Sequence, residues 1–214
     1  MPSPVCDQAL ETAAARVAPP GLLVGCRRIE PHDAGYLLPE ERESITVRAP
    51  VRRAASGTAR RIAHDLLRRM GQSDVAVLRG SAGEPLWPRG IVGSIAHDDE
   101  MAVAAAAGTD AFGSVGIDIE TAEPLPRELE RMVSTPSDRL DGLDPRLAGR
   151  ILFAAKEAVY KAAFPLDRQM LGFEDISVDF QSGRAATSTG RCLRLVFIVT
   201  SHVLTLAFTR VEEA

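Results

Sequence analysis

Two short segments carry side chains that could act together on a charged substrate. In the apolar, strand-like run Val115–Glu120, Asp118 and Glu120 are two residues apart, and alternate residues of a strand point to the same face. In an alanine-rich, helix-like run, Glu157 and Lys161 are four residues apart, which also places them on one face. Three carboxylates and a lysine that converge would suit a divalent cation and a phosphate ester.

Each pair also has an ordinary structural interpretation. The strand pair would also fit the solvated face of an edge strand whose other face is buried. Glu157 and Lys161, with Lys156 beside them, match the common Glu-to-Lys pair on an exposed helix. Against the second interpretation, Glu157 shares a helix face with Phe153 and lies one turn from Tyr160. These bulky neighbours indicate a helix that is packed on both sides.

Three further features could belong to the same site, the first two as phosphate contacts. The run Ile91–His97 ends in a histidine, a residue that is more often structural than catalytic, and Gly93 would let a backbone approach closely. Arg52 and Arg60 are eight residues apart and fall on roughly one helix face. Guanidinium groups there could bind a phosphate through paired hydrogen bonds, although most surface arginines only make a protein more soluble. The single tryptophan, Trp87, would be a core plug or a pocket wall.

Hydrophobic periodicity and turn residues divide the chain into elements. Pro39 suits the first turn of a helix, and Gly71 suits the residue that follows a long one. Helices are expected at 4–17, 39–43, 50–70 and 150–164, the last ended by Pro165, with a short helix or two within 124–147. Strands are expected at 22–29, 75–78, 91–97, 101–107, 115–120, 176–180, 193–200 and 203–209.

The order of elements predicts the fold class. Helix followed by strands occurs twice, which favours an α+β fold over a doubly wound parallel sheet. We therefore expect two similar α+β halves with mostly antiparallel sheets, at residues 1–120 and 121–214. The chain of 214 residues is long enough to bury a substantial core.

The composition limits the classes of function. The formal net charge of −4 argues against a general nucleic-acid binder. Cys6, Cys26 and Cys192 are scattered, without a CxxC pair or a histidine at ligand spacing. This predicts neither a disulfide framework nor a zinc site, and it fits a cytoplasmic protein. We expect no signal peptide, and no apolar run reaches the roughly 18 residues of a membrane helix.

Four motifs occur along the chain in an order that is specific to one family. They are RR…R at residues 52–60, GEPLWPRGIVGSIAH, VGIDIE, and FAAKEAVYKAAFPL…LGFED. Together they resemble the Sfp-type 4′-phosphopantetheinyl transferases, in the branch of the enterobactin synthase component D proteins and the actinobacterial enzymes. The resemblance covers about residues 35–180. It implies the fold of that family, a pseudo-twofold pair of α+β halves.

The resemblance implies a reaction and a set of catalytic residues. The 4′-phosphopantetheine arm of coenzyme A would pass to a serine of an apo carrier protein, leaving adenosine 3′,5′-bisphosphate. Magnesium, or manganese in its place, would bind at Asp118 and Glu120, with Ile119 between them, and at Glu157. Glu157 would be a metal ligand, the general base for the serine, or both. Lys161 would neutralise charge on the phosphates during transfer, beside Asp118.

The resemblance also assigns contacts to coenzyme A. Arg52 and Arg60 would bind its 3′-phosphate. The residues beside the adenine and ribose phosphate would be Arg79, Gly80, Ser81 and Ala82. The remaining phosphate contacts would come from Ala96, His97, Asp118, Glu157 and Lys161, and Leu171 would line the pantetheine arm. The first half would thus bind the coenzyme phosphates and adenine, and the second half would carry the catalytic helix.

Three positions depart from the family pattern. Ala96 replaces the usual serine or threonine before the histidine, Ala82 stands where a second lysine is frequent, and Ala55-Ser56 replaces a Glu-Phe pair. These changes bear on phosphate affinity and leave the metal and base positions intact. They motivate a second hypothesis, a coenzyme A-binding or carrier-binding paralogue with impaired catalysis. A third, an unrelated Mg²⁺-dependent phosphohydrolase, leaves the Trp-Pro loop and the Lys-Glu helix unexplained.

The expected partners are apo acyl or peptidyl carrier proteins of fatty-acid, polyketide or nonribosomal peptide synthases. Family members often contact the carrier through the stretch that corresponds to residues 121–147. Carrier proteins are usually acidic, so basic or apolar residues of this acidic stretch are the better contacts. Those residues are Arg127, Leu129, Arg131 and Met132. A monomer is expected because the two halves would build one site between them.

Overall fold

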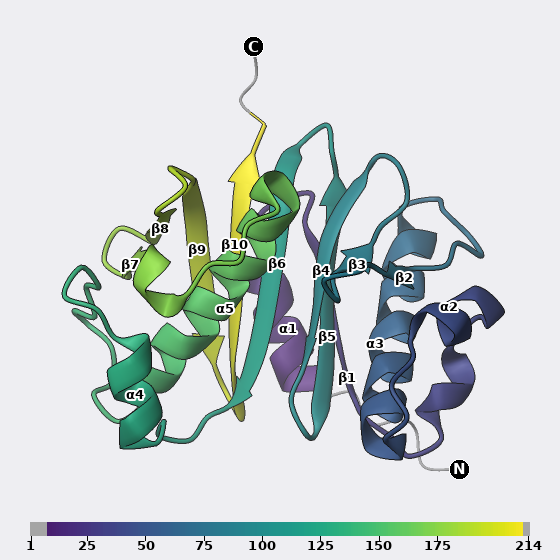
Figure 1. Ribbon diagram of the computed structural model, residues 1–214, viewed down its shortest axis with the longest axis horizontal. Coiled ribbons are helices and arrows are strands. Elements are labelled where there is room, and N and C mark those ends of the chain that lie inside the picture. Colours follow the sequence, from purple (N-terminus) through teal and green to yellow (C-terminus); the bar gives the residue numbers. More distant parts are fainter. Residues whose placement is uncertain (1–7, 212–214) are drawn as a thin grey trace.

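The computed structural model describes residues 8–211, whose strands form two larger antiparallel sheets side by side and a third, two-stranded sheet (Figure 1). The α-helices are α1 (Gln8–Val17), α2 (Pro39–Ser44), α3 (Pro50–Arg69), α4 (Arg127–Val133) and α5 (Ala148–Asp167). Short 3₁₀ turns are η1 (Asp33–Tyr36) and η2 (Phe173–Asp175). The strands are β1 (Leu23–Arg28), β2 (Leu78–Arg79), β3 (Pro85–Leu86), β4 (Ile91–His97), β5 (Met101–Gly108), β6 (Phe112–Thr121), β7 (Ile176–Asp179), β8 (Arg184–Thr187), β9 (Cys192–Val199) and β10 (His202–Arg210). The α+β class and the antiparallel sheets are confirmed; residues 4–7 of the first expected helix, with Cys6, lie outside the described residues.

The first sheet has the strand order β1-β5-β4 and is covered by α3. Its central strand, β5, is alanine-rich and buried on both faces. Ala102, Ala104 and Ala106 pack against Ile62 and Leu66 of α3. The alternate residues of β5 face a second core cluster on the other side of the sheet. A strand that is buried on both faces shows no polar alternation, yet the expected strand is confirmed.

The second sheet has the strand order β6-β10-β9-β8-β7 and is covered by α5 (Figure 1). The sequence predicted β6, β7, β9 and β10 but not β8. β8 has only four residues, and none of them is large and apolar. Its place comes from pairing with β7 and β9 on either side.

One apolar core joins the two sheets. It contains buried side chains of α1, β1, β5, β6 and β10, and β4 of the first sheet lies beside β6 of the second. β6 belongs by hydrogen bonding to the second sheet, although it lies within the expected first half, and the division at residue 120 stays a prediction. No helix within residues 8–211 is both long and apolar enough to cross a bilayer.

Several boundaries differ from the sequence prediction, among them the start of β6, which lies at Phe112 and not at residue 115. α5 continues through Pro165 to Asp167 and ends at Arg168, which has a left-handed φ of 54°. A proline in the last turn loses one helical hydrogen bond but need not stop the helix there. The strand expected at 75–78 is reduced to the Leu78–Arg79 pairing with β3. Gly71, at φ 79°, follows α3 as predicted.

Lys156 on α5 is fully buried and is not part of a solvated helix face. Its ammonium lies 2.8 Å from Asp138 Oδ2, and it donates to the carbonyl oxygens of Val133 and Phe173 at 2.9 and 3.0 Å. Asp138 in turn accepts hydrogen bonds from the backbone amides of Thr135 and Val178. The pair therefore fastens α5 to the end of α4, to η2 and to β7.

We expect Lys156→Met to lower the free energy of unfolding by about 3 kcal/mol, because it leaves the buried Asp138 carboxylate without its counter-ion. Urea unfolding measures this loss. The double variant Lys156→Met/Asp138→Asn should recover part of it. Arg68→Met removes an exposed ion pair with Asp65 and should cost less than about 1 kcal/mol. An equal cost for the two single variants would contradict the structural role of Lys156.

Candidate active site between β6 and α5

Asp118 and Glu120 share one face of β6, as the strand pattern predicts, and α5 covers this face. The alternate residues Ile117 and Ile119 point the other way, into the shared core. Asp118 is 5% exposed, and its Oδ1 accepts a hydrogen bond from Lys161 Nζ at 2.5 Å. The structure thus brings together one predicted residue from each of the two segments.

The pKa of Asp118 is raised to about 7, first because burial penalises the charged form. The adjacent Lys161 ammonium opposes this shift, while the negative charges of Glu157 and Glu120 add to it. Glu157 is half-buried and lies one helical turn before Lys161 on α5. The site therefore concentrates negative charge in a poorly solvated place, which a bound cation would relieve.

Glu120 is held by Arg150, a residue that the sequence analysis did not single out. Arg150 Nη1 donates to Glu120 Oε2 at 2.6 Å, and its Nε donates to the Glu123 carbonyl oxygen at 3.1 Å. Burial raises the pKa of Glu120, and Arg150 lowers it in opposition. A sequence signal existed, because Arg150 precedes Glu157 by seven residues, two helical turns, on the same helix face.

A divalent cation fits this site as a partner of Asp118. Among residues 8–211, no three His, Cys, Asp or Glu side chains form a ready ligand cluster, so the three predicted carboxylates do not make a closed cage. Asp118 Oδ2, however, is buried without a hydrogen-bond partner in the described chain. Magnesium usually binds one or two carboxylates together with substrate phosphates. Ile119 has its side chain in the core, so only its main-chain oxygen is of a type that binds Mg²⁺.

A cavity of about 470 Å³ opens beside the ion pair, between β4, β6 and α5. Of the residues predicted to bind the coenzyme, Arg79, Ala82 and Lys161 line it. Its apolar wall contains Leu86, Trp87, Ile95, Tyr160 and Phe164. Trp87 is thus both a core residue and part of a pocket wall, which joins the two interpretations of the sequence.

Arg52 and Arg60 of α3 do not share one helix face. Arg52 is exposed, whereas Arg60 is buried and donates from Nε to the Val77 carbonyl oxygen at 2.7 Å. Burial lowers the pKa of Arg60 to about 10, and the charge of Arg79 adds to that shift. Eight residues advance a helix by 80° beyond two turns, which is enough to separate the two side chains. The structure instead brings Arg60 near Arg79.

The turn at Gly80–Gly83 is organised by Glu84, another residue that the sequence analysis did not assign. Glu84 Oε2 accepts the backbone amide of Ala82 at 3.1 Å, and Oε1 accepts a hydrogen bond from Arg168 Nη1 at 2.5 Å. Both charged residues line the cavity. Ser81 is exposed beside them.

The remaining predicted residues lie farther from the cavity wall. His97 is exposed, with Nδ1 3.2 Å from the Asp98 carbonyl oxygen. The Ala96 methyl group is buried in the shared core, so a hydroxyl there would face apolar side chains. Gly93, by contrast, lines the cavity, and a Cβ there would lie 2.5 Å from the Ala105 carbonyl oxygen and 2.6 Å from the Trp87 indole. Leu171 packs in the α5 core cluster and is not part of the cavity wall.

Comparison with protein families gives consecutive matches to two family models. The 4′-phosphopantetheinyl transferase N-terminal domain matches residues 40–107. The 4′-phosphopantetheinyl transferase superfamily matches residues 114–207. The second match contains α5 and all but the first two residues of β6, and it includes Asp118, Glu120, Glu157 and Lys161.

Curated proteins of three bacteria are similar over most of the chain. 4′-Phosphopantetheinyl transferase PptT of Mycobacterium tuberculosis is 39% identical over 165 residues, which cover 75% of this chain and 72% of PptT. 4′-Phosphopantetheinyl transferase Npt of Nocardia iowensis is 39% identical over 155 residues, covering 71% and 70%. 4′-Phosphopantetheinyl transferase Svp of Streptomyces mobaraensis is 39% identical over 165 residues, covering 73% and 66%.

We expect Asp118→Asn to stabilise the metal-free protein at neutral pH. The folded carboxyl keeps its proton up to about pH 7, whereas an aspartate in the unfolded chain, with its ordinary pKa of 3.8, has lost its proton well before then. The stability of the wild-type protein therefore falls as the pH rises from the unfolded pKa of 3.8 to the folded pKa of about 7. An asparagine, which does not ionise, does not cause this loss. In urea unfolding with a chelator, the variant should gain at least about 1 kcal/mol over wild type between about pH 5 and about pH 8. A difference that does not change with pH would contradict the burial of this charge.

Proposed function

The chain belongs to the 4′-phosphopantetheinyl transferase superfamily, and from this premise we propose that it transfers the 4′-phosphopantetheine arm of coenzyme A to a serine of apo acyl or peptidyl carrier proteins. The observation that carries the proposal is the meeting of Lys161 and Asp118 at a cavity between the two sheets. A cation at the wall of a partly apolar cavity, paired with a buried carboxylate that does not itself line the cavity, suits a diphosphate that bears a long, uncharged arm.

Two groups of cations would hold the coenzyme phosphates. Arg60 and Arg79 repel each other in the protein alone, and an anion between them would remove that repulsion. This supports the 3′-phosphate at these two arginines. Lys161, whose side chain is 27% exposed, would hold the diphosphate. His97 and the exposed Arg52 remain proposed phosphate contacts at the rim.

The carboxylates on β6 would hold a divalent cation, magnesium or manganese. Asp118 offers an unpartnered buried oxygen, and Glu120 has one oxygen that Arg150 does not use. Glu157 stands close enough to affect the pKa of Asp118. When bound, the ion would neutralise charge on the diphosphate. The absence of a protein cage of three ligands among the described residues is consistent with an ion that is completed by substrate phosphates.

Glu157 is the proposed general base. In the reaction, the serine hydroxyl oxygen forms a bond to the coenzyme phosphorus that bears pantetheine. The bond from that phosphorus to the bridging oxygen breaks, and adenosine 3′,5′-bisphosphate leaves with the bond's electron pair. The serine proton passes to the Glu157 carboxylate. Lys161 would balance the charge that develops on the phosphate oxygens.

The pantetheine arm would lie against the apolar wall of the cavity, formed by Leu86, Trp87, Tyr160 and Phe164. Leu171 packs against the same α5 core cluster as Tyr160 of this wall. The amphipathic arm has amide groups along an aliphatic chain, which suits a wall of aromatic and aliphatic side chains with a few polar groups.

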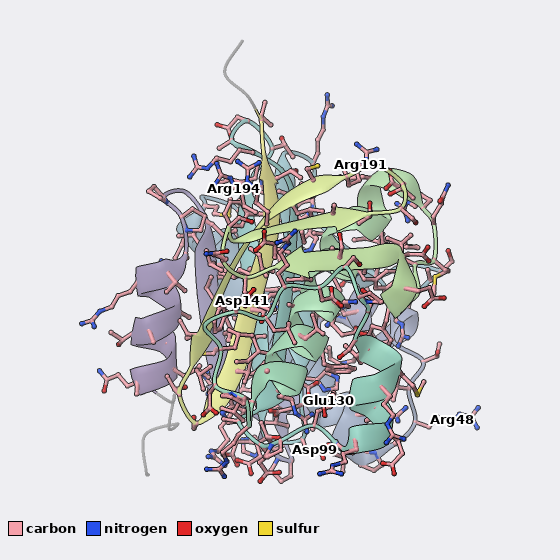
Figure 2. All side chains as sticks on the ribbon, turned by 90° about the vertical axis from the view of Figure 1, so that its left-hand side faces the viewer. Arg48, Asp99, Glu130, Asp141, Arg191 and Arg194 are labelled. Atoms are coloured by element: carbon pink, nitrogen blue, oxygen red, sulfur yellow. The ribbon has the colours of Figure 1, made fainter. Side chains whose placement is uncertain are left out.

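The proposed carrier contact is α4 and its flanks. Leu129 and Met132 are 41% and 64% exposed, three residues apart on one side of the helix, with Arg127 and Arg131 nearby. Figure 2 shows the acidic Glu130 of α4 in the lower part of the molecule, away from Arg194 in the upper part. We therefore favour a carrier contact in which exposed apolar side chains of α4 pack against the carrier and nearby arginines pair with its acidic groups. A long-range attraction between the whole protein and an acidic carrier is less favoured.

We further propose that one chain suffices for activity and that it acts in the cytoplasm. The proposed site takes residues from both sheets of a single chain, which supports a monomer. Cys192 is an exposed free thiol, as expected in a reducing compartment. The impaired paralogue is not supported, because the named relatives are transferases.

The proposal predicts that an apo carrier gains the mass of one phosphopantetheine when it is mixed with the protein, coenzyme A and Mg²⁺. Asp118→Ala and Glu157→Ala should each lower the rate at least about 100-fold, because a cation site or a general base is lost. Intact-protein mass spectrometry over time measures the gain, and circular dichroism checks that the variants fold.

Asp65→Ala is the matched control, since it removes an exposed carboxylate that pairs with Arg68 on α3. Its rate should equal that of wild type. No mass gain with several carrier types would refute the transferase proposal. A near-normal rate for either site variant would refute only the role given to that residue.

A further inference from the structure

Two buried polar atoms beside the site lack partners in the described chain, Thr205 Oγ1 and Asp118 Oδ2. Thr205 is completely buried on β10. Leaving a buried hydroxyl unpaired costs about 1–3 kcal/mol, and valine would fill the same shape without that cost. The hydroxyl of Thr205 therefore needs an explanation that its packing does not provide.

The two residues face each other directly. Thr205 is the register partner of Asp118 in the β10–β6 ladder, and side chains of opposed residues leave the same face with Cβ atoms about 4.5–5.5 Å apart. The neighbouring Val203 and Ala207 pack with α5 residues, so this face lies beneath α5. A donor without an acceptor thus stands next to an acceptor without a donor.

The same ladder contains a matched pair in which this contact is made. Ser114 and Thr209 are also register partners on this face, and their hydroxyl oxygens lie 3.1 Å apart in a hydrogen bond. The geometry of the ladder therefore allows opposed polar side chains to meet. In Asp118, Oδ1 already accepts a hydrogen bond from Lys161. Oδ2 is therefore the oxygen that is available for a further contact.

We propose that Thr205 is a positioning residue for Asp118, whose hydroxyl donates to the carboxylate when Asp118 takes up its divalent cation. This inference rests on the proposed metal role of Asp118. A carboxylate oxygen can bind a cation with one lone pair and accept a hydrogen bond with the other. Carboxylates that bind metals are themselves usually hydrogen-bonded, and loss of such a partner typically weakens metal binding about 10–100-fold.

The proposal gives Thr205 two opposite effects. In the metal-free protein its hydroxyl is unsatisfied and destabilising, and in the loaded protein it orients a ligand. A residue that only fills space would show neither effect. Thr205→Val should therefore raise the stability of the metal-free protein while weakening its affinity for the ion.

The test uses Mn²⁺ alone as the probe, titrated into the full-length protein and followed by the electron paramagnetic resonance signal of the free ion. Thr205→Val should bind about 10-fold more weakly, whereas Thr205→Ser, which keeps the hydroxyl, should stay within about twofold of wild type. Thermal unfolding in a chelator should show a higher midpoint for Thr205→Val than for wild type.

Thr209→Val is the matched control, since it removes a satisfied hydroxyl from the same face of β10. It should bind Mn²⁺ as wild type does and unfold at a lower temperature. If Thr205→Val does not fold, Thr205→Ala against Thr205→Ser gives the same comparison.

Two failures can be told apart. If Asp118→Asn loses Mn²⁺ and Thr205→Val binds it as wild type does, the inference about Thr205 is wrong and the metal role of Asp118 stands. If Asp118→Asn also binds Mn²⁺ normally, the proposed metal role itself is wrong. Equal weakening by Thr205→Val and Thr205→Ser would overturn the hydroxyl as the cause.

Discussion

The site depends on the close approach of α5 to β6 at Gly116. A Cβ on this residue would overlap the carbonyl oxygen of Ala158 on the helix, so glycine alone lets the helix backbone rest on the strand. Glu157 and Lys161 flank that contact on α5, and Asp118 follows it on β6. The same approach removes Asp118 from water and raises its pKa. Contact, burial and electrostatics at the site thus have one origin.

The charges around this contact divide into two kinds. The Lys156–Asp138 pair is buried, is bonded on all sides to backbone groups, and fixes the rest of α5 in place. The Lys161–Asp118 pair is incompletely satisfied, because one carboxylate oxygen and the opposed hydroxyl of Thr205 have no partner in the described chain. A rigid helix held by the first pair keeps the second in a costly arrangement, as expected where stability is given up for binding.

Sequence patterns found what local periodicity encodes. The strand alternation predicted that Asp118 and Glu120 share one face, and the helix spacing predicted the same for Glu157 and Lys161; the structure then brings Lys161 onto Asp118. What they missed depends on tertiary packing. The burial of Lys156 comes from neighbours in the α4, η2 and β7 regions, and Thr205 meets Asp118 only through strand register. Arg52 and Arg60 show the limit of spacing arguments, since 80° on a helix separates an exposed side chain from a buried one.

The central claim is that the contact between β6 and α5 forms the place where coenzyme A and a divalent cation meet. The most direct measurement is the anomalous difference density of Mn²⁺ in a crystal of the protein with coenzyme A. The account predicts a peak at ligand distance from Asp118 Oδ2, with the diphosphate beside Lys161 and the pantetheine arm along Tyr160 and Phe164. A manganese peak away from Asp118, with coenzyme A bound outside the cavity, would contradict it.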